Sequence, residues 1–88
     1  MSFVKNLDFE PRAQKEIEHW RKVDKATTKK IVRLIDEILH TPYYGTGKPE
    51  TRKHEFSGCW SRRIDKEHRL VYRVEGDTVI IMSCRFHY

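Results

Sequence analysis

The segment from His54 to Tyr88 constrains the fold of this chain more than any other part of the sequence. It contains three runs rich in β-branched and aromatic residues, at positions 60–64, 68–74 and 78–85, which is typical of β-strands. Only short turn-like stretches, 65–67 and 75–77, separate these runs. Strands joined by such short connections pair as antiparallel hairpins, so the pattern predicts a β-meander.

The middle run predicts a sheet with two unlike faces, because successive side chains of a strand point to opposite sides. One face is apolar and the other is largely cationic, with Leu70, Tyr72 and Val74 alternating with Arg69, Val71 and Arg73. We expect the apolar face to pack in the core. The second face, with its arginines, is then open to a ligand.

Two helical patterns precede the strands. Glu10-Pro11 indicates a helix start, followed by apolar residues at i, i+4 and i+7, namely Ala13, Ile17 and Trp20. Asp24 is a suitable N-cap for a second helix, which ends near His40 before Pro42. Its apolar stripe consists of Ile31, Leu34, Ile35, Ile38 and Leu39. The charged residues expected on the outward faces are Arg12, Lys15, Glu16, Glu18 and Arg21 in the first helix and Lys29, Lys30, Arg33, Asp36 and Glu37 in the second.

The remaining segments complete the expected order of elements. Leu7 and Phe9 fit a short edge strand within residues 1–9, and the Gly- and Pro-rich stretch 42–53 predicts a loop that leads into the sheet. Residues 53–56 lead from this loop into the sheet, and the expected order is β-α-α-β-β-β-β. This is an α+β fold, with a two-helix hairpin packed on one face of a mostly antiparallel, twisted sheet, and residues 1–88 are expected to form one domain.

The charge of the chain is compatible with a polyanionic partner. Lys and Arg number 18 against 13 Asp and Glu, a net charge of +5. Nucleic acid is one interpretation and a solvated cationic surface is the other, and composition does not separate them. Cys59 and Cys84 form no CxxC motif, and we expect both to be reduced packing residues. No apolar run reaches the ~18 residues of a membrane span and no secretion signal is visible, so we expect no membrane association and a cytoplasmic location.

Several polar residues fit cleavage of RNA without a metal or cofactor. Arg63, Arg69, Arg73 and Arg85 are expected on the cationic face, Glu50 and Lys53 lie where the loop meets the sheet, and His87 and Tyr88 follow the last strand. In such a reaction a base takes the proton of the ribose 2′-OH, an acid protonates the leaving 5′-oxygen, and a guanidinium stabilises charge on the phosphorane. Tyr88 would stack on a base.

Each of these residues also has a simpler interpretation. Glu50 fits a solvated loop carboxylate, His87 a frayed chain end, and Arg69 a cross-strand ion pair. His54 and His68 fit polar residues at strand edges. From the residues alone, the chain is a basic α+β domain that binds or cuts RNA.

Five segments closely resemble the YoeB/Txe toxins of the RelE/ParE superfamily, the toxin halves of YefM–YoeB-type toxin–antitoxin pairs. The segments are T-P-Y-Y-G-T-G-K-P-E, R-K-H, S-G-C-W-S-R-R-I, E-H-R-L-V-Y and C-R-F-H-Y. The resemblance extends over the chain from Leu7 and is strongest from Thr41 to Tyr88. It implies a RelE/ParE-like fold and a metal-independent endoribonuclease that cuts mRNA in the ribosomal A site and so inhibits translation.

The resemblance also implies roles for individual residues. Glu50 in G-K-P-E would be the general base, Arg69 in E-H-R-L-V-Y the phosphate clamp, His87 the general acid, and Tyr88 would position the substrate. The expected RNA contacts are Lys53, His54, Arg63 and Arg73. Three positions depart from the family pattern, namely Arg52, Cys59 and Phe86, and none of them is one of the four catalytic positions.

The implied partners are mRNA, the ribosome and a YefM-like antitoxin, with operator DNA bound only by the toxin–antitoxin complex. A toxin homodimer is a further expectation. Two other functions stay open on the sequence: a ParE-like gyrase poison, and a non-catalytic module that binds RNA or the ribosome. Fold alone does not separate these functions.

Overall fold

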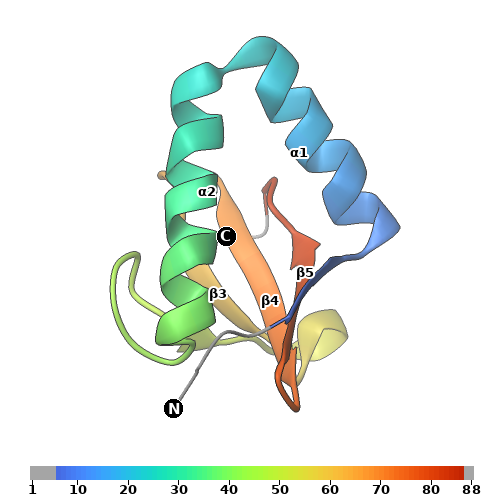
Figure 1. Cartoon of the computed structure of the whole chain (residues 1–88), viewed down its shortest axis with the longest axis vertical. Helices are drawn as coiled ribbons and strands as arrows, with labels where there is room; N and C mark the ends of the chain where they lie inside the picture. Colours follow the sequence, from blue (N-terminus) through green and yellow to red (C-terminus); the bar gives the residue numbers. More distant parts are fainter. Residues whose placement is uncertain (1–5, 87–88) are drawn as a thin grey trace.

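The computed structural model describes residues 6–86, except for the side chain of Glu55, and contains two helices packed on a five-stranded sheet (Figure 1). The strands lie in the order β1-β5-β4-β3-β2. Their bounds are Asn6–Phe9 for β1, Glu50–Thr51 for β2, Trp60–Arg63 for β3, Arg69–Glu75 for β4 and Thr78–Ser83 for β5. Only β1 pairs in parallel, with β5, and the other pairs are antiparallel. The expected α+β fold and element order are confirmed.

The helices begin and end where the sequence predicts. Helix α1 spans Pro11–Val23 and α2 spans Lys25–His40. Asp24 separates them: its backbone N–H donates to the Trp20 carbonyl at 2.8 Å, and its Oδ1 accepts from the Thr27 amide at 3.0 Å. This hydrogen bond from the Thr27 amide is the main reason that the pKa of Asp24 is lowered. One residue therefore ends the first helix through its backbone and caps the second through its side chain.

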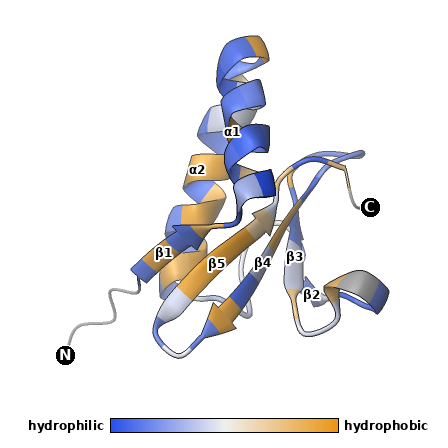
Figure 2. Ribbon diagram, turned by 90° about the vertical axis from the view of Figure 1, so that its right-hand side faces the viewer, coloured by the Kyte–Doolittle hydropathy of each residue, from blue (hydrophilic) through white to orange (hydrophobic). Residues whose placement is uncertain are grey.

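The core lies between the helices and the sheet. Helix α2 contributes Ile31, Leu34, Ile35 and Ile38, and the facing strands contribute Leu70, Tyr72, Val79 and Ile81, all buried. Figure 2 shows β5 and much of α2 in hydrophobic colours, whereas most of α1 is hydrophilic. Helix α1 contributes mainly Ala13 and Trp20 to this core. The packing of the apolar stripe on the apolar sheet face is as predicted.

The cysteines take the packing role expected of them. Cys59 and Cys84 are buried and form no disulfide. Burial is the main cause that raises the pKa of Cys84 to about 12, with the Glu16 carboxylate as a second cause. The Cys84 thiol is therefore protonated and unreactive near neutral pH.

The structure differs from the predicted strand bounds in two places. Residues 50–51, expected inside a loop, form β2 against β3, with Glu50 opposite Ser61 and Thr51 opposite Trp60. Strand β5 ends at Ser83 instead of continuing to residue 85. It ends there because the N–H and C=O groups of Cys84 bond to helix α1 and not to β4, an arrangement that strand propensity cannot anticipate.

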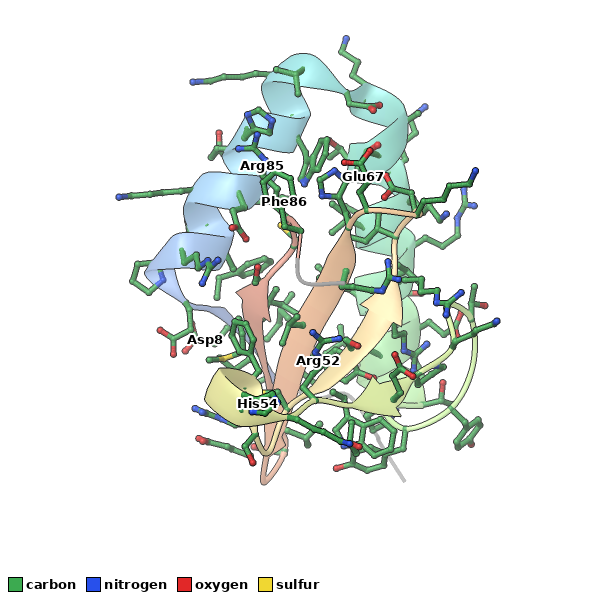
Figure 3. The ribbon with its side chains drawn as sticks, turned by 180° about the vertical axis from the view of Figure 1, so that it is seen from behind. Asp8, Arg52, His54, Glu67, Arg85 and Phe86 are labelled. Carbon is green, nitrogen blue, oxygen red and sulfur yellow. The ribbon has the colours of Figure 1, made fainter. Side chains whose placement is uncertain are left out.

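The second face of the sheet is less open than expected. Val71, on the same face as the arginines, is buried, and so is Ser61 opposite it. A 3₁₀ turn, His54–Phe56, lies on the side of the sheet away from the helices (Figure 3). Of the charged residues on this face, Glu50, Arg63 and Glu75 are exposed, whereas Arg69 and Arg73 are half-buried.

Two glutamates expected on outward helix faces point inward. Glu16 accepts from the Cys84 amide at 2.8 Å and from the Ser83 hydroxyl at 2.9 Å. Glu37 accepts from the Arg62 Nη1 at 2.7 Å and also from the Thr46 amide. Helical periodicity placed them on the polar face, but each has backbone donors from another element within reach. The prediction for these two residues is wrong because their partners come from distant parts of the sequence.

Candidate functional site

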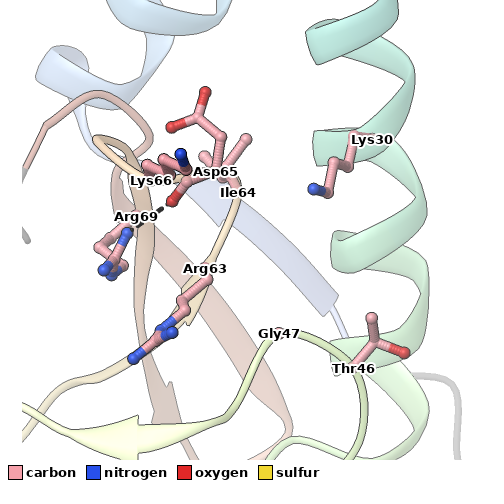
Figure 4. Close-up of a pocket in the computed structure, with 8 residues that line it drawn as sticks. All are labelled: Lys30, Thr46, Gly47, Arg63, Ile64, Asp65, Lys66 and Arg69. Atoms are coloured by element: carbon pink, nitrogen blue, oxygen red, sulfur yellow. Dashed lines mark hydrogen bonds between the residues drawn. The ribbon is translucent and has the colours of Figure 1, made fainter.

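Two arginines face each other across the β3–β4 hairpin. Arg63 pairs directly with Arg69, so both side chains leave the sheet on the same face (Figure 4). Like charges directly opposite each other destabilise a strand pair. Arg63 is exposed, and its side chain forms no ion pair with any carboxylate described in residues 6–86. The arrangement is unfavourable for the sheet alone and favourable for an anion placed between the two guanidinium groups.

These arginines line a hollow of about 520 Å³ at the end of the hairpin. Lys66 of the β3–β4 turn and Lys30 of α2 line it as well, and Asp65 is the carboxylate among its lining residues (Figure 4). Arg69 is held in place by its Nη1, which donates to the Asp65 carbonyl at 2.8 Å and to the His68 carbonyl at 3.1 Å. Because these partners are neutral, Arg69 keeps its positive charge available for a ligand.

Glu50 lies on the same face as the arginine pair. It is opposite Ser61 in the β2–β3 register, Ser61 is opposite Val71, and Arg69 is two residues from Val71 along β4. Strands lie about 4.8 Å apart and rise about 3.4 Å per residue, so the Cα atoms of Glu50 and Arg69 are about 12 Å apart. Both side chains are long enough to reach into this gap. The Arg69 guanidinium is turned toward the carbonyls of Asp65 and His68 at the end of the hairpin.

A second, smaller hollow lies at the β2 edge. Its volume is about 280 Å³ and it is lined by Glu50, Thr51, Arg52, Lys53 and His54. Lys53 and His54 are exposed, and Arg52 is half-buried (Figure 3). The structure therefore brings the expected RNA contacts Lys53 and His54 next to Glu50 and not next to Arg69. Arg63 lies on β3, the strand between β2 and β4.

Arg73 is less suited to binding an anion than Arg63 or Arg69. It lies further along the same face of β4, and its Nε forms an ion pair with the Glu75 Oε2 at 2.8 Å. Its charge is therefore partly neutralised. Arg85, beyond the end of β5, lies over the Phe86 ring at 5.0 Å.

The last two expected catalytic residues, His87 and Tyr88, lie outside the described residues. The described chain ends at Phe86, whose carbonyl accepts from the Arg69 backbone N–H at 2.8 Å. The Phe86 amide donates to His68 Nδ1 at 2.8 Å. The residue that precedes His87 is thus bonded to the strand that carries Arg69.

The sequence analysis missed Arg62, which is fully buried on the helix-facing side of β3. Its Nη1 donates to Glu37 at 2.7 Å, its Nη2 to the Thr41 and Tyr44 carbonyls, and its Nε to the Tyr72 hydroxyl at 3.3 Å. The Thr46 amide is the main cause that lowers the pKa of Glu37, with Arg62 as a further cause. Strand alternation was the available signal, because Arg62 lies between Trp60 and Ile64 on the inward face.

Two further properties concern the described residues as a set. Within residues 6–86, no group of three or more His, Cys, Asp or Glu side chains is arranged to hold a metal ion. Neither described helix has the length and apolar character needed to cross a membrane.

Comparison with known proteins gives matches along nearly the whole chain. A family model for the YoeB-like toxin of bacterial type II toxin–antitoxin systems matches residues 9–88. Toxin RelK of Mycobacterium tuberculosis is 46% identical over 85 residues, which is 97% of this chain and 100% of that protein. Toxin YoeB of Escherichia coli K12 is 53% identical over 70 residues, which is 80% of this chain and 83% of that protein.

Solved structures agree with the sequence matches. The YoeB/ParE toxin from Agrobacterium tumefaciens superposes with a TM-score of 0.88 at 40% identity, covering 94% of this chain and 99% of that chain. YoeB in the YoeB–YefM complex from Staphylococcus aureus gives 0.86 at 39% identity, covering 96% and 98%. A YoeB dimer from the same organism gives 0.87 at 40% identity, covering 97% and 99%. By sequence and by structure, this chain belongs to the YoeB family of toxins from bacterial type II toxin–antitoxin systems.

Proposed function

We propose that this toxin is a ribosome-dependent endoribonuclease that cleaves mRNA in the ribosomal A site, without a metal or cofactor. The observation that carries the proposal is the directly opposed pair of Arg63 and Arg69 with Glu50 on the same sheet face. Two guanidinium groups and a carboxylate on either side of a gap suit a phosphodiester and the ribose hydroxyl next to it. Family membership supports this choice over other uses of a basic face.

In the proposed reaction Glu50 acts as the general base. Its carboxylate takes the proton of the ribose 2′-OH, and the 2′-oxygen then forms a bond to phosphorus. Glu50 is exposed in a two-residue strand at the sheet edge, where RNA can approach it. Lys53 and His54 in the adjoining hollow contact the strand of RNA that passes Glu50.

Arg69 acts as the phosphate clamp. Its guanidinium is anchored by the neutral carbonyls of Asp65 and His68, so it is positioned before the substrate arrives. A donor fixed in advance at the place where phosphorane charge develops lowers the barrier most effectively. Arg63 binds the same phosphate or its neighbour, and Arg73 makes a weaker contact because Glu75 pairs with it.

The reaction is completed at the leaving oxygen. His87 gives its proton to the 5′-oxygen as the bond between phosphorus and that oxygen breaks, which leaves a 2′,3′-cyclic phosphate and a free 5′-hydroxyl. Tyr88 stacks on a base and fixes the RNA. Both residues follow Phe86 directly in the sequence, and Phe86 is bonded to the backbone of Arg69.

The partners follow from the same proposal. The substrate is mRNA on a translating ribosome in the cytoplasm, and the inhibitor is a YefM-like antitoxin. The YoeB–YefM complex and the YoeB dimer from Staphylococcus aureus, whose toxin chains are close in structure to this one, support the antitoxin and a homodimer. Operator DNA is bound by the toxin–antitoxin complex and not by the toxin alone.

The decisive experiment is primer extension on a message translated in the presence of the purified toxin. We expect cuts in phase with the codons, and no cuts in the same mRNA without ribosomes. Glu50→Ala is expected to lower cleavage by roughly 10²–10⁴-fold with an unchanged melting curve, because it removes a base that is exposed on a two-residue strand at the sheet edge. Glu18→Ala, on the outer face of α1, serves as the matched loss of an exposed carboxylate.

Three outcomes would contradict the proposal. An uncut message together with stalled replication would favour a gyrase poison, and ribosome binding without any cut would favour a non-catalytic module. Loss of cleavage on adding a chelator selective for transition metals, with the Mg²⁺ of the ribosome maintained, would contradict metal independence.

A further inference from the structure

The segment after β5, from Cys84 to Phe86, is held by contacts that the proposed reaction leaves unexplained. Glu16 of α1 accepts from the Cys84 amide at 2.8 Å, and Trp20 Nε1 donates to the Cys84 carbonyl at 2.9 Å. Both backbone polar groups of Cys84 are thus bonded to one helix. Beyond Cys84, the contacts shift from α1 to the start of β4, where Phe86 lies (Figure 3).

His68 makes the side-chain contact at this second position. Its Nδ1 accepts from the Phe86 backbone N–H at 2.8 Å. A backbone N–H can only donate, so Nδ1 must be the unprotonated nitrogen of the ring, which fixes the tautomer. The imidazole packs edge-on against Trp20, with ring centroids 4.8 Å apart, and against the Phe86 ring at 5.0 Å. The orientation of His68 is therefore set by the same tryptophan that holds Cys84.

The backbone of Phe86 is in a conformation that requires such support. Its φ angle is +62°, in the left-handed region that residues with a side chain rarely adopt. A strained residue of this kind persists only where surrounding contacts determine it. Here the contacts are His68 Nδ1 on the amide and the Arg69 N–H, at 2.8 Å, on the carbonyl. Phe86 itself is 46% exposed, so burial of its side chain does not account for its position.

We propose that His68 is a positioning residue for RNA cleavage, which fixes the backbone of Phe86 beside Arg69 and thereby sets the direction in which the chain continues to His87 and Tyr88. The inference rests on the proposed function, since it has His68 act on the segment that leads to His87, the proposed general acid. His68 touches no substrate in this role. It acts through the peptide unit of Phe86, and a small rotation there would displace the residues that follow.

Two substitutions test separately the hydrogen-bond acceptor of His68 and the packing of its ring. His68→Phe keeps a ring against Trp20 and Phe86 but has no acceptor for the Phe86 amide. His68→Asn lacks the ring, but its Oδ1 can occupy the position of Nδ1 and accept the same N–H. His19→Phe is the matched control, because His19 also packs edge-on against Trp20, with ring centroids 5.3 Å apart.

The measurements are kcat and KM for cleavage on ribosomes and hydrogen exchange of the Phe86 amide. We expect His68→Phe to lower kcat roughly ten- to a hundredfold with little change in KM, because misplacing a catalytic group by about 1 Å costs on this order. The Phe86 amide should exchange faster in the same variant. His68→Asn should recover most of kcat and of the protection, and His19→Phe should behave as the wild type.

Wild-type kcat in His68→Phe would overturn the inference, and so would an equal loss in His68→Phe and His68→Asn, since the ring and not the acceptor would then be needed. Unchanged exchange of the Phe86 amide in His68→Phe would overturn the claim that His68 fixes the backbone of Phe86. A wild-type protein that does not cleave would instead overturn the proposed function. The exchange comparison would then still report separately on the hydrogen bond from Phe86 to His68.

Discussion

Arg62 and Arg63 follow each other in β3, and the pleat of the strand sends their side chains to opposite faces of the sheet. Arg62 is fully buried, and all three of its side-chain nitrogens donate hydrogen bonds to Glu37, to loop carbonyls and to Tyr72. Arg63 is exposed, and the side chain directly opposite it is another arginine.

The difference teaches how to separate a structural charge from a functional one. Arg62 connects α2, the loop after it and the sheet, so its partners are supplied by the fold. Arg63 and Arg69 are paired with each other, an arrangement that opposes folding and favours a bound anion. One face of β3 therefore stabilises the fold and the other is available to a ligand. Substitution of Arg62 should lower stability, whereas substitution of Arg63 or Arg69 should weaken RNA binding or cleavage with little loss of stability.

The largest effect is expected for Arg62→Ala. It leaves Glu37 and the carbonyls of Thr41 and Tyr44 without their partner, and removing one member of a buried pair costs about 3–5 kcal/mol in the free energy of unfolding. For a domain of this size, that lowers the melting temperature by about 12 °C or more. The measurement is a thermal melt with Arg21→Ala as control, because the Arg21–Glu18 pair is exposed. A melt like that of the wild type would show that Arg62 is not structural.

The second effect concerns cleavage and not folding. Arg69→Ala is expected to lower kcat by about 10²–10³-fold, as removal of other preorganised donors to developing charge does. Arg73→Ala should cost much less, because Arg73 is already paired with Glu75. Both variants should melt within a few degrees of the wild type. Equal losses of kcat in the two variants would show that the face carries only diffuse positive charge.

A smaller effect, with opposite signs in stability and binding, is expected for Arg63→Ala. Removal of one of two opposed like charges should raise the free energy of unfolding by up to about 0.5 kcal/mol. Loss of a phosphate contact should weaken binding of a non-cleavable, 2′-deoxy-substituted RNA and lower the slope of log K against log salt by about 0.7. Lys22→Ala is the control, because it removes one positive charge at the end of α1, away from the arginine pair. If Arg63→Ala lowered the stability and left RNA binding unchanged, Arg63 would be a structural residue like Arg62.

The smallest effect is a pH dependence on the Arg62 side of the sheet. Hydrogen bonds from Thr46 and then Arg62 lower the pKa of Glu37 in the folded protein. A lowered folded pKa contributes stability above the unfolded value, near ~4.3, and that stability is lost as the pH falls through the folded value.

Glu37→Gln should therefore be less stable than the wild type at pH 7, and the difference should shrink as the pH falls below about 4.3. Chemical denaturation between pH 3 and pH 7 measures it, with Asp36→Asn, an exposed neighbour on α2, as control. A difference that stays constant with pH would mean that the carboxylate charge of Glu37 does not contribute.

Much of the fold was determined by local sequence. The Asp24 cap, the apolar stripe of α2 and the alternation in β4 each depend on residues a few positions apart, and each predicted element is present. The alternation in β4 likewise placed Arg69 and Arg73 on one face, because strand parity is a local property. Glu50 was expected in the loop that leads into the sheet, and only the pairing of β2 with β3 places it on that face. The roles of Glu50, Arg69, His87 and Tyr88 remain predictions.

Only the tertiary structure decided which polar residues have partners. Arg62 bonds to Glu37 and to the loop at Thr41, and Glu16 bonds to Cys84, across separations in sequence that no periodic pattern records. His68 had the features of a polar residue at a strand edge, and the Phe86 amide became its partner only when β5 ended beside β4. Hydrogen bonding satisfies whichever donor and acceptor the fold brings together, whereas the sequence by itself specifies only the periodicity that decides which side chains point inward.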